Sequence, residues 1–454
     1  MNTNPEIVKC KLDSILQDMA EHFWLFSANP GHDFMRQNTG KLSFYDTMRL
    51  ILSMGKGTCS DELIDYFNMN PVTIPSPSAL IQRRHQILPS AFEYLFDAFS
   101  SSCTQITHAV KGHCLLGSDG AHVVYATNSE IIQDYNKPRM ADYKGYNHMH
   151  LNGFIDVNSK AFVDVLIQPG QQPDERAALH AMLDHFSPDN PSSYIVTADR
   201  GYESYDLIFH LELKKFRYVL RVKSPASPKS LLSSFSDELP DDQDEFDVTI
   251  KKFFTDKYTK EMKSRPQVYH YMNPTKNIPH FAPLLNGRHL VYLAFRVVKL
   301  KSPDGSFEYI ITNLPHSFDI EDIRECYHLR WGCETTFRYL KHAAGLLYFH
   351  SKLPDFLLQE TYATLVMYNF GVFLANEAAD EYRRQHNKPG NKYQYTVDFS
   401  TAIRTARKYF LHKPQDKEMD VIGLLCRFVH AVKEKYRKFA RPLRGIGAIR
   451  FNYR

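Results

Sequence analysis

Four side chains with different chemistry are spaced at helical intervals in the last third of the chain: Tyr327, Arg330, Glu334 and Lys341. An α-helix turns by about 100° per residue, so offsets of three, seven and fourteen fall within roughly 60° of one another. A carboxylate between cations and a phenol on one face can meet both a metal ion and phosphates. The alternative is a solvated helix face with an i,i+4 pair between Arg330 and Glu334.

Two aspartates follow apolar runs in the middle of the chain. Asp119 ends the run CLLGSD, and Asp199 ends the β-branched run SYIVTAD. We expect both acids at the C-terminal tips of buried strands, where α/β sheets collect their ligands. The alternative is that these acids and Glu334 are unrelated capping residues.

Three carboxylates converging from two strands and a helix suit a hard divalent cation such as Mg²⁺, which prefers oxygen ligands. Two such ions about 3.5–4 Å apart can activate a water or a 3′-hydroxyl and stabilise the leaving oxygen in a displacement at phosphorus. The pattern of Asp119, Asp199 and Glu334 therefore indicates metal-dependent phosphoryl transfer.

The elements that would position these acids change in type along the chain. Apolar spacings of three and four predict only helices up to about residue 108, with Ser60 and Ser78 as expected N-caps. Three strands, a helix, a strand, a helix and a strand follow, then a β-rich stretch. The expected order ends with one helix over residues 317–345 and three further helical stretches to about residue 440.

The last expected helix of the N-terminal region is basic and would expose Gln82, Arg83 and His85. Two short helices followed by a basic one are typical of a helix-turn-helix module, whose last helix enters the major groove of DNA. Short helix pairs are also common packing units, so a purely structural role is the alternative.

Bulk properties restrict the class of protein. The chain has 454 residues, enough for two to three domains, and 43% of them are hydrophobic, which is typical of a globular protein. Seven cysteines without a CxxC pair argue against a disulfide framework and a zinc ribbon, and favour a reducing cytoplasm. The N-terminus lacks a signal-peptide pattern, and the uncharged stretch Thr361–Asn376 is too short for a membrane span, so we expect a buried helix there.

Charge is unevenly distributed although the formal net charge is only +4. Residues 431–454 carry eight Lys or Arg against one Glu, which predicts a tail that lies on phosphate or is simply solvated. Residues 237–247 are strongly acidic, so we expect a solvated loop facing away from DNA.

The spacing Tyr-x2-Arg-x3-Glu-x6-Lys resembles the signature of insertion-sequence transposases of the DDE class, the group that cuts DNA through hairpin intermediates. The segments GSDG around Asp119, TADRGY around Asp199 and ITNLP at Ile311–Pro315 are similar to that family as well. The resemblance covers roughly Gly117 to Lys341. It implies an α/β fold with a ribonuclease-H-like catalytic core and a β-rich insertion between the second Asp and the Glu.

The resemblance also implies a domain plan and partners. The plan is an N-terminal helical DNA-binding domain at 1–110, a catalytic domain at 111–345 with its insertion at about 224–316, and a C-terminal helical region with a basic tail at 346–454. The implied partners are double-stranded DNA, as transposon ends and target, and a second copy in a homodimer assembled on DNA. The implied location is a bacterial-type cytoplasm, in association with the nucleoid, without a membrane.

The resemblance assigns roles to the residues singled out above. Asp119, Asp199 and Glu334 would be catalytic and hold Mg²⁺, with Mn²⁺ as a substitute. Tyr327, Arg330 and Lys341 would hold the cleaved DNA end near the metals.

Further site residues carry two interpretations each. Trp331 would stack on an unpaired base or fill the core, and Arg200 would contact phosphate or form a structural ion pair. His148 and His150 point to one face of an expected strand near His122, but no further soft ligand stands out, so zinc is not expected there.

The expected function is cut-and-paste DNA transposition. A nick at the element end frees a 3′-hydroxyl, this hydroxyl forms a hairpin, water reopens the hairpin, and the 3′-end attacks target DNA. One site serves every step because each is the same displacement. The alternatives are a transposase-derived DNA-binding repressor without cleavage activity and a structure-specific nuclease without strand transfer.

Overall fold

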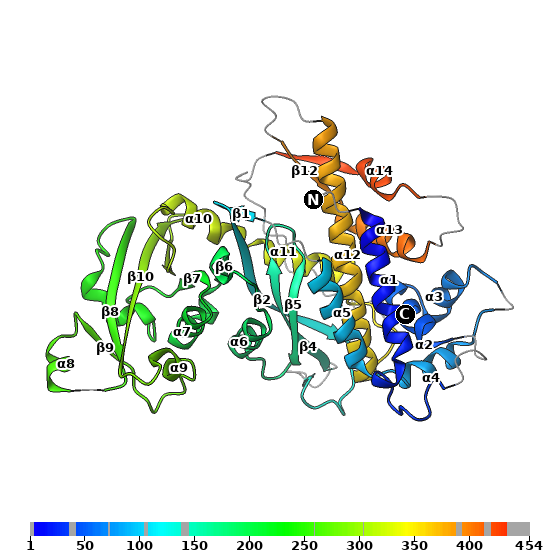
Figure 1. The fold of residues 1–454 in the computed structure, drawn as a ribbon, viewed down its shortest axis with the longest axis horizontal. Helices are drawn as coiled ribbons and strands as arrows, with labels where there is room; N and C mark the ends of the chain where they lie inside the picture. The colour runs from blue at the N-terminus through cyan, green and yellow to red at the C-terminus, as the bar shows by residue number, and fades with distance from the viewer. Residues whose placement is uncertain are drawn as a thin grey trace.

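A computed structural model describes residues 4–35, 42–70, 73–103, 108–137, 145–257, 259–302, 304–386, 393–412 and 419–433. It is a mixed α/β structure built on one large sheet, with the N-terminal helices at one end of the long axis and the β-rich stretch at the other (Figure 1). The expected α/β class is confirmed.

The N-terminal region is helical, as expected. Its helices are α1 (Pro5–Glu21), α2 (Phe44–Ser53), α3 (Cys59–Tyr66), α4 (Pro77–His85) and α5 (Pro89–Cys103), with a short 3-10 turn, η1, at Phe23–Leu25.

The two expected N-caps of this region are each misplaced by two residues. Thr58, not Ser60, caps α3 and forms a reciprocal capping box with Asp61. Ser76, not Ser78, caps α4, since Pro77 occupies the first turn and the cap must precede it.

The centre of the sheet contains the strands on which the aspartates were expected. They lie in the order β5 (Phe162–Pro169), β4 (Tyr146–Asp156), β2 (His113–Tyr125), β6 (Tyr194–Ala198) and β7 (Arg217–Val222). The first three pair antiparallel, and β2, β6 and β7 pair parallel. The helices α6 (Glu175–His185) and α7 (Tyr205–Leu213) connect them in the expected chain order.

The β-rich stretch continues the same sheet. Strand β11 (Phe307–Thr312) pairs antiparallel with β7, followed outward by β10 (Leu290–Lys301), β8 (Phe246–Thr255) and β9 (Tyr269–Tyr271). Helical segments η5 (Leu231–Glu238), α8 (Lys260–Ser264) and α9 (Phe281–Leu285) accompany these strands, and the short strands β1 (His108–Val110) and β3 (Tyr135–Asn136) flank β2 and β4. Backbone hydrogen bonding therefore runs without a break from the central strands to the outermost ones.

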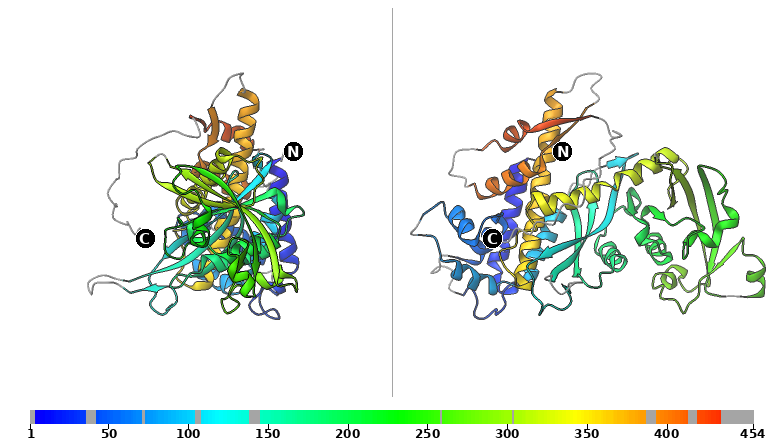
Figure 2. Two further views of the ribbon diagram at one scale, coloured as in Figure 1. Left: turned by 90° about the vertical axis from the view of Figure 1, so that its left-hand side faces the viewer. Right: turned by 180° about the vertical axis from the view of Figure 1, so that it is seen from behind.

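The segment expected as one helix over 317–345 is interrupted. It consists of α10 (Ile320–Leu329), α11 (Gly332–Arg338) and a π turn, η6, at Tyr339–Ala343. At the junction the backbone closes shorter i to i+3 hydrogen bonds, from the Arg330 N–H to the Tyr327 carbonyl at 3.2 Å and from the Cys333 N–H to the Arg330 carbonyl at 2.9 Å. Tight and wide turns inside a helix often mark functional sites. Figure 2 shows the yellow α10–α11 segment crossing the molecule when seen from behind.

The C-terminal region is built around α12 (Pro354–His386), which contains the stretch Thr361–Asn376. Leu365, Val366 and Phe370 are fully buried there, so the expected core helix is confirmed. Helices α13 (Phe399–Leu411) and α14 (Val421–Cys426) follow, together with a strand pair that was not expected, β12 (Tyr393–Val397) and β13 (Val429–Lys433). Of the described helices, none has the length and apolar character needed to cross a bilayer.

The acidic segment differs from expectation, and most of the basic segment lies outside the described residues. Residues 237–247 are mostly exposed, but they are paired rather than freely solvated: Asp241 lies 3.0 Å from Lys299, and Glu245 lies 2.6 Å from Arg324 of α10. Most of the basic segment, residues 434–454, falls outside the described residues.

The sheet separates two hydrophobic cores. Leu115, Ala121 and Val123 of β2 contribute to the core shared with α11, α12 and the N-terminal helices. Leu116 contributes to the core on the other face, with α6 and α7. Because side chains alternate along a strand, the odd-numbered residues of this part of β2 face α11.

Candidate active site

The sheet brings the two aspartates side by side. Strands β2 and β6 pair in parallel up to Ser118 opposite Ala198, so Asp119 and Asp199 are the next residues on adjacent strands. The strand-end position expected for Asp199 is confirmed. For Asp119 it is wrong, because β2 continues to Tyr125 through antiparallel pairing with β4. The parallel part of the sheet still ends at Asp119, so both acids sit at that edge.

Glu334 reaches the same face because α11 packs directly on β2. Gly117 lies two residues before Asp119, and a Cβ built there would overlap the Cys333 sulfur. A Cβ on Gly332 would press on Val157 at 3.0 Å. Two missing side chains therefore let the helix approach the strand closely. Cys333 is the residue before Glu334, so this contact sets the height of the third carboxylate above the sheet.

Asp119 is a carboxyl that the protein alone does not satisfy. Its side chain accepts a hydrogen bond from its neighbour, the Gly120 N–H, at 2.9 Å. Burial raises the pKa of Asp119 to about 6; the negative charges of Glu175 and Glu334 add to the shift, and Gly120 and Arg330 oppose it. The raised pKa indicates that the Gly120 N–H and Arg330 do not offset the cost of burying this carboxylate.

Asp199 is better compensated. Burial acts to raise its pKa, but the Arg200 N–H and the charges of Arg330 and Arg221 outweigh burial, and the pKa lies below its usual value. The Arg221 guanidinium donates to Asp199 Oδ1 at 3.2 Å, and the Tyr327 hydroxyl lies 3.5 Å from the same oxygen.

Arg330 is a buried cation with unused hydrogen-bonding capacity. It is only 3% exposed, and among the described residues its Nε has no hydrogen-bond partner. Its ion pair with Glu334 is long, at 3.7 Å. The charges of Tyr327, Asp199 and Asp119 outweigh burial and raise its pKa. A buried guanidinium with free donors is suited to an anion that comes from outside the chain.

The remaining signature residues divide between buried and exposed positions. Tyr327 is 3% exposed, so the solvated-face alternative is wrong for it and for Arg330. Lys341 lies on the π turn; burial lowers its pKa, and the charge of Asp119 partly offsets the effect, so the two groups are neighbours. Trp331 is 50% exposed and does not fill the core. Arg200 is exposed, and within the described part of the chain it forms no ion pair closer than 4 Å.

Three charged residues at the site were not anticipated. Arg221 bridges Asp199 and Glu308, at 3.2 Å to each, and Glu175 acts on Asp119 through its charge. Arg221 lies in the run FRYVLRVK, which was expected to form a strand. A cation inside such a run was the signal available in the sequence. Glu308 and Glu175 had no such signal, because they reach the site through register and helix packing.

The histidines considered as metal ligands do cluster, on the opposite face. His122 lies opposite His150 in the β2–β4 register, and their Nδ1 atoms are 3.4 Å apart. His150 Nε2 contacts Glu175 Oε1 at 3.1 Å. His148 shares this face with His150, as expected. These rings are therefore separate from the face that carries Asp119 and Asp199.

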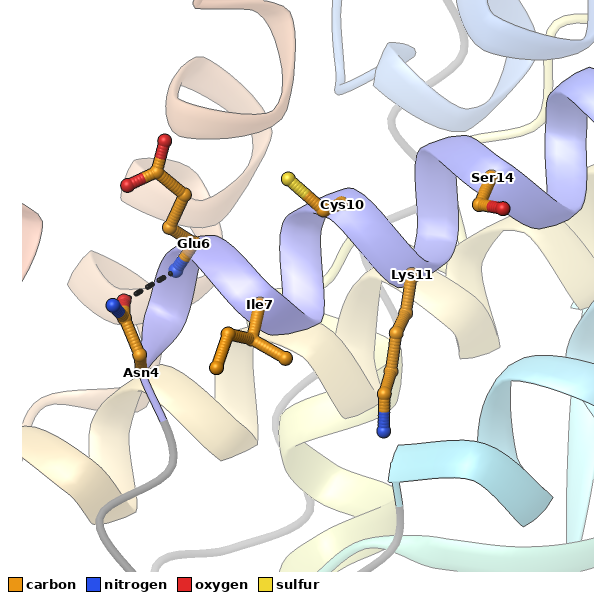
Figure 3. Close-up of a pocket in the computed structure, with 6 residues that line it drawn as sticks. All are labelled: Asn4, Glu6, Ile7, Cys10, Lys11 and Ser14. Carbon is orange, nitrogen blue, oxygen red and sulfur yellow. Dashed lines mark hydrogen bonds between the residues drawn. The ribbon is translucent and has the colours of Figure 1, made fainter.

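Two surface hollows of about 550 Å³ each lie in the N-terminal region and contain none of the acids. One runs along α1 beside Ile7 and Lys11 (Figure 3). The other borders α4 at Gln82 and Arg83. Helix α4 exposes Gln82 and His85 as expected, and Arg83 donates to Gln86 at 2.9 Å.

Comparisons with known proteins place the chain in a family. A search of curated proteins gives no match. Among solved structures, a piggyBac transposase synaptic complex with hairpin DNA, determined by cryo-electron microscopy, aligns with a TM-score of 0.44 and 12% identity, over 91% of this chain and 83% of that chain. The family model described as Transposase DDE domain matches residues 117–370, more than half of the chain and a range that includes Asp119, Asp199 and Glu334. The chain therefore belongs to the DDE transposase family.

Proposed function

We propose that this protein is a cut-and-paste DNA transposase that cleaves the ends of its element through hairpin intermediates and joins the freed 3′-ends to target DNA. The observation that carries the proposal is the meeting of Asp119 and Asp199 with Glu334 around the buried Arg330. The signature from Tyr327 to Lys341 supports the hairpin-forming group within the family.

The proposed fold of the catalytic core is ribonuclease-H-like. The order β5-β4-β2-β6-β7, antiparallel on one side of β2 and parallel on the other, supports it. We retain the domain plan of residues 1–110, 111–345 and 346–454. The continuous sheet supports treating the insertion at about 224–316 as part of the catalytic domain.

Asp119, Asp199 and Glu334 fit divalent metal ions. They are oxygen ligands, as Mg²⁺ and Mn²⁺ prefer, and burial raises the pKa of Asp119, so a bound cation would stabilise its charged form. When bound, two such ions supply an activated oxygen nucleophile and stabilise the leaving oxygen. Two features of this chain position the ligands: the absence of a side chain at Gly117 lets α11 approach β2, and Arg221 holds Asp199 in place.

The proposed DNA contacts follow from charge and exposure. Arg330 has free donors for two phosphate oxygens, and Tyr327 and Lys341 border the same acids. Arg200 is exposed beside Asp199 and is available to a phosphate further along the strand. Half-exposed Trp331 is suited to stack on a base extruded at the hairpin.

The proposed partners are double-stranded DNA, as element ends and target, and a second copy, since two ends must be cut together in a homodimer assembled on DNA. The exposed Gln82 and His85 of α4 are the proposed N-terminal DNA contacts. The proposed setting is the cytoplasm and nucleoid of a bacterial cell.

The test is cleavage of a labelled duplex that carries the inverted repeat flanking the coding sequence, with Mg²⁺ or Mn²⁺. The intact protein is compared with Glu334→Gln, which keeps the side-chain size and removes one charge. We expect a metal-dependent nick followed by a hairpin, and a loss of both products by about a thousandfold or more in the variant.

The control is Glu321→Gln on the exposed surface of α10, which should cut normally. DNA binding without cleavage by the intact protein would favour the repressor alternative. Nicking without any joined product would favour the nuclease. Cleavage that survives in Glu334→Gln would place the active site elsewhere.

A further inference from the structure

A second cluster of ligating side chains lies on the face of the sheet opposite the acids. His180 of α6, His210 of α7 and His280, the residue before α9, come together from segments far apart in the sequence. Their candidate ligand atoms all lie within 4.8 Å of one another. Figure 1 shows α6, α7 and α9 on the same side of the sheet.

Each of the three rings has one nitrogen held by a carboxylate. Asp206 Oδ2 lies 3.3 Å from His180 Nε2 and 2.9 Å from His280 Nδ1. Asp184 Oδ1 lies 3.1 Å from His210 Nε2. A carboxylate that holds one ring nitrogen while the other is left for a metal is the usual surrounding of a metal-bound histidine.

The carboxylates also restrict the tautomers of the facing rings. An ionised carboxylate can only accept, so the hydrogen bond to Asp184 puts the proton of His210 on Nε2 and leaves a lone pair on its Nδ1. His180 Nδ1 lies 2.8 Å from this atom. When His180 carries its proton on Nε2, toward Asp206, two lone pairs face each other, and a positive ion between them removes the repulsion.

We propose that His180 Nδ1, His210 Nδ1 and His280 Nε2 bind one Zn²⁺ ion, with Asp206 and Asp184 orienting the rings. Three neutral imidazoles suit zinc, whereas Mg²⁺ prefers the oxygen ligands of the acid site. The ion would join the two helices that flank Asp199 to the beginning of α9 in the β-rich stretch, and its role is to fasten these parts together.

Binding requires a defined local change. All three rings are stacked: the planes of His180 and His210 are 21° apart, and each lies 11° from the plane of His280. Zinc–nitrogen bonds of about 2.0–2.1 Å in a tetrahedral site place the nitrogens about 3.3 Å apart. The rings of His180 and His210 therefore move apart by about half an ångström, and the stacked rings turn so that each plane contains the ion.

The test uses the full chain, stripped with a chelator and carrying Asp119→Asn to weaken the acid site. Zinc is added and its content is measured after desalting, and Co²⁺ is used in parallel because tetrahedral cobalt absorbs strongly in the visible range. We expect one zinc per chain, a tetrahedral cobalt spectrum and a melting temperature that rises with zinc. All three are lost when His280→Ala is added.

Two further variants keep the proposal falsifiable. His289→Ala removes an exposed histidine of the same β-rich stretch and should bind zinc normally. Asp206→Asn keeps the side-chain volume and should weaken zinc binding about 10–100-fold. Urea unfolding of the metal-free variants shows whether each is folded. Absence of bound zinc in the parent chain, or equal zinc in folded His280→Ala, would overturn the proposal.

Discussion

Two buried carboxyls in this protein respond to burial in opposite ways. Glu360 of α12 lies where α4 and α12 pack together, 2.7 Å from the Arg84 guanidinium and 3.0 Å from His350 Nδ1. Burial acts to raise its pKa, but His350 and Arg84 outweigh burial and the pKa falls below its usual value. At Asp119 burial prevails and the pKa rises to about 6.

The difference separates a structural charge from a functional one. Glu360 has its cations within the chain, so its negative charge is compensated in the folded protein. Asp119 keeps a raised pKa although the charge of Arg330 opposes burial, so we expect the further cation it needs to come from solution. A buried acid with a raised pKa is a candidate for function, whereas the charge of Glu360 is compensated by partners within the chain.

The largest expected effect compares the two carboxyls directly. Glu360→Gln should lower the free energy of unfolding by about 3–5 kcal/mol, because it leaves the buried Arg84 without its partner. Asp119→Asn should leave the metal-free protein equally stable or make it more stable, because it removes an ill-compensated charge. Urea unfolding at pH 7 with a chelator measures both. Equal destabilisation by the two substitutions would break the comparison.

The next effect is a pH dependence that comes from His350. Hydrogen bonds and charge from Glu360 and Glu62 outweigh burial and raise its pKa to about 9, against about 6.5 for an ordinary histidine. A raised folded-state pKa stabilises the protein fully below about pH 6.5, and this stability is lost as the pH rises through about 9. The loss should be about 2–3 kcal/mol in unfolding free energy, and His350→Gln should flatten the profile. The exposed His289→Gln is the control and should leave the profile unchanged.

The next smaller effect concerns Arg330, which acts on Asp119 and Asp199 at the acid site. Arg330→Lys keeps the charge but loses the planar fork, so DNA cleavage should fall about 10–100-fold while unfolding changes little. Single-turnover cleavage of the labelled end measures this. Arg324→Lys, on the preceding helix, should cut at the parental rate, because Arg324 pairs with Glu245 and Glu321 instead of the acids. Normal cleavage by Arg330→Lys would mean that its donors do not meet phosphate.

The smallest effect concerns Trp331. Loss of base stacking in Trp331→Ala should cost about 1 kcal/mol, and should slow hairpin formation without slowing the first nick. The chain's other tryptophan, Trp24, is also exposed, and Trp24→Ala should affect neither step. Equal slowing of both steps would assign Trp331 to general DNA binding.

Much of this arrangement was visible in the sequence. The β-branched run before Asp199 and the helical spacing around Glu334 are local patterns, and the structure places both on the expected kinds of element. The face that each aspartate occupies also follows from alternation once the strands are known.

What the sequence did not show depends on partners far along the chain. Ser118, Asp119 and Gly120 have the composition of a turn, yet pairing with β4 carries β2 through them. The junction at Arg330 was missed although Gly332, a poor helix former, lies beside it and was an available signal. The histidines of α6, α7 and the start of α9 are separated by 30 and 70 positions, so no local pattern joined them.

The unbroken ladder from β7 through β11 to β8 has a mechanical consequence. A flexible hinge would let the outer strands move independently of the acids. Here a force on β8 or β10 is transmitted through backbone hydrogen bonds to β7, which pairs with the strand that precedes Asp199. DNA bound at the outer strands would therefore be held rigidly relative to the acids.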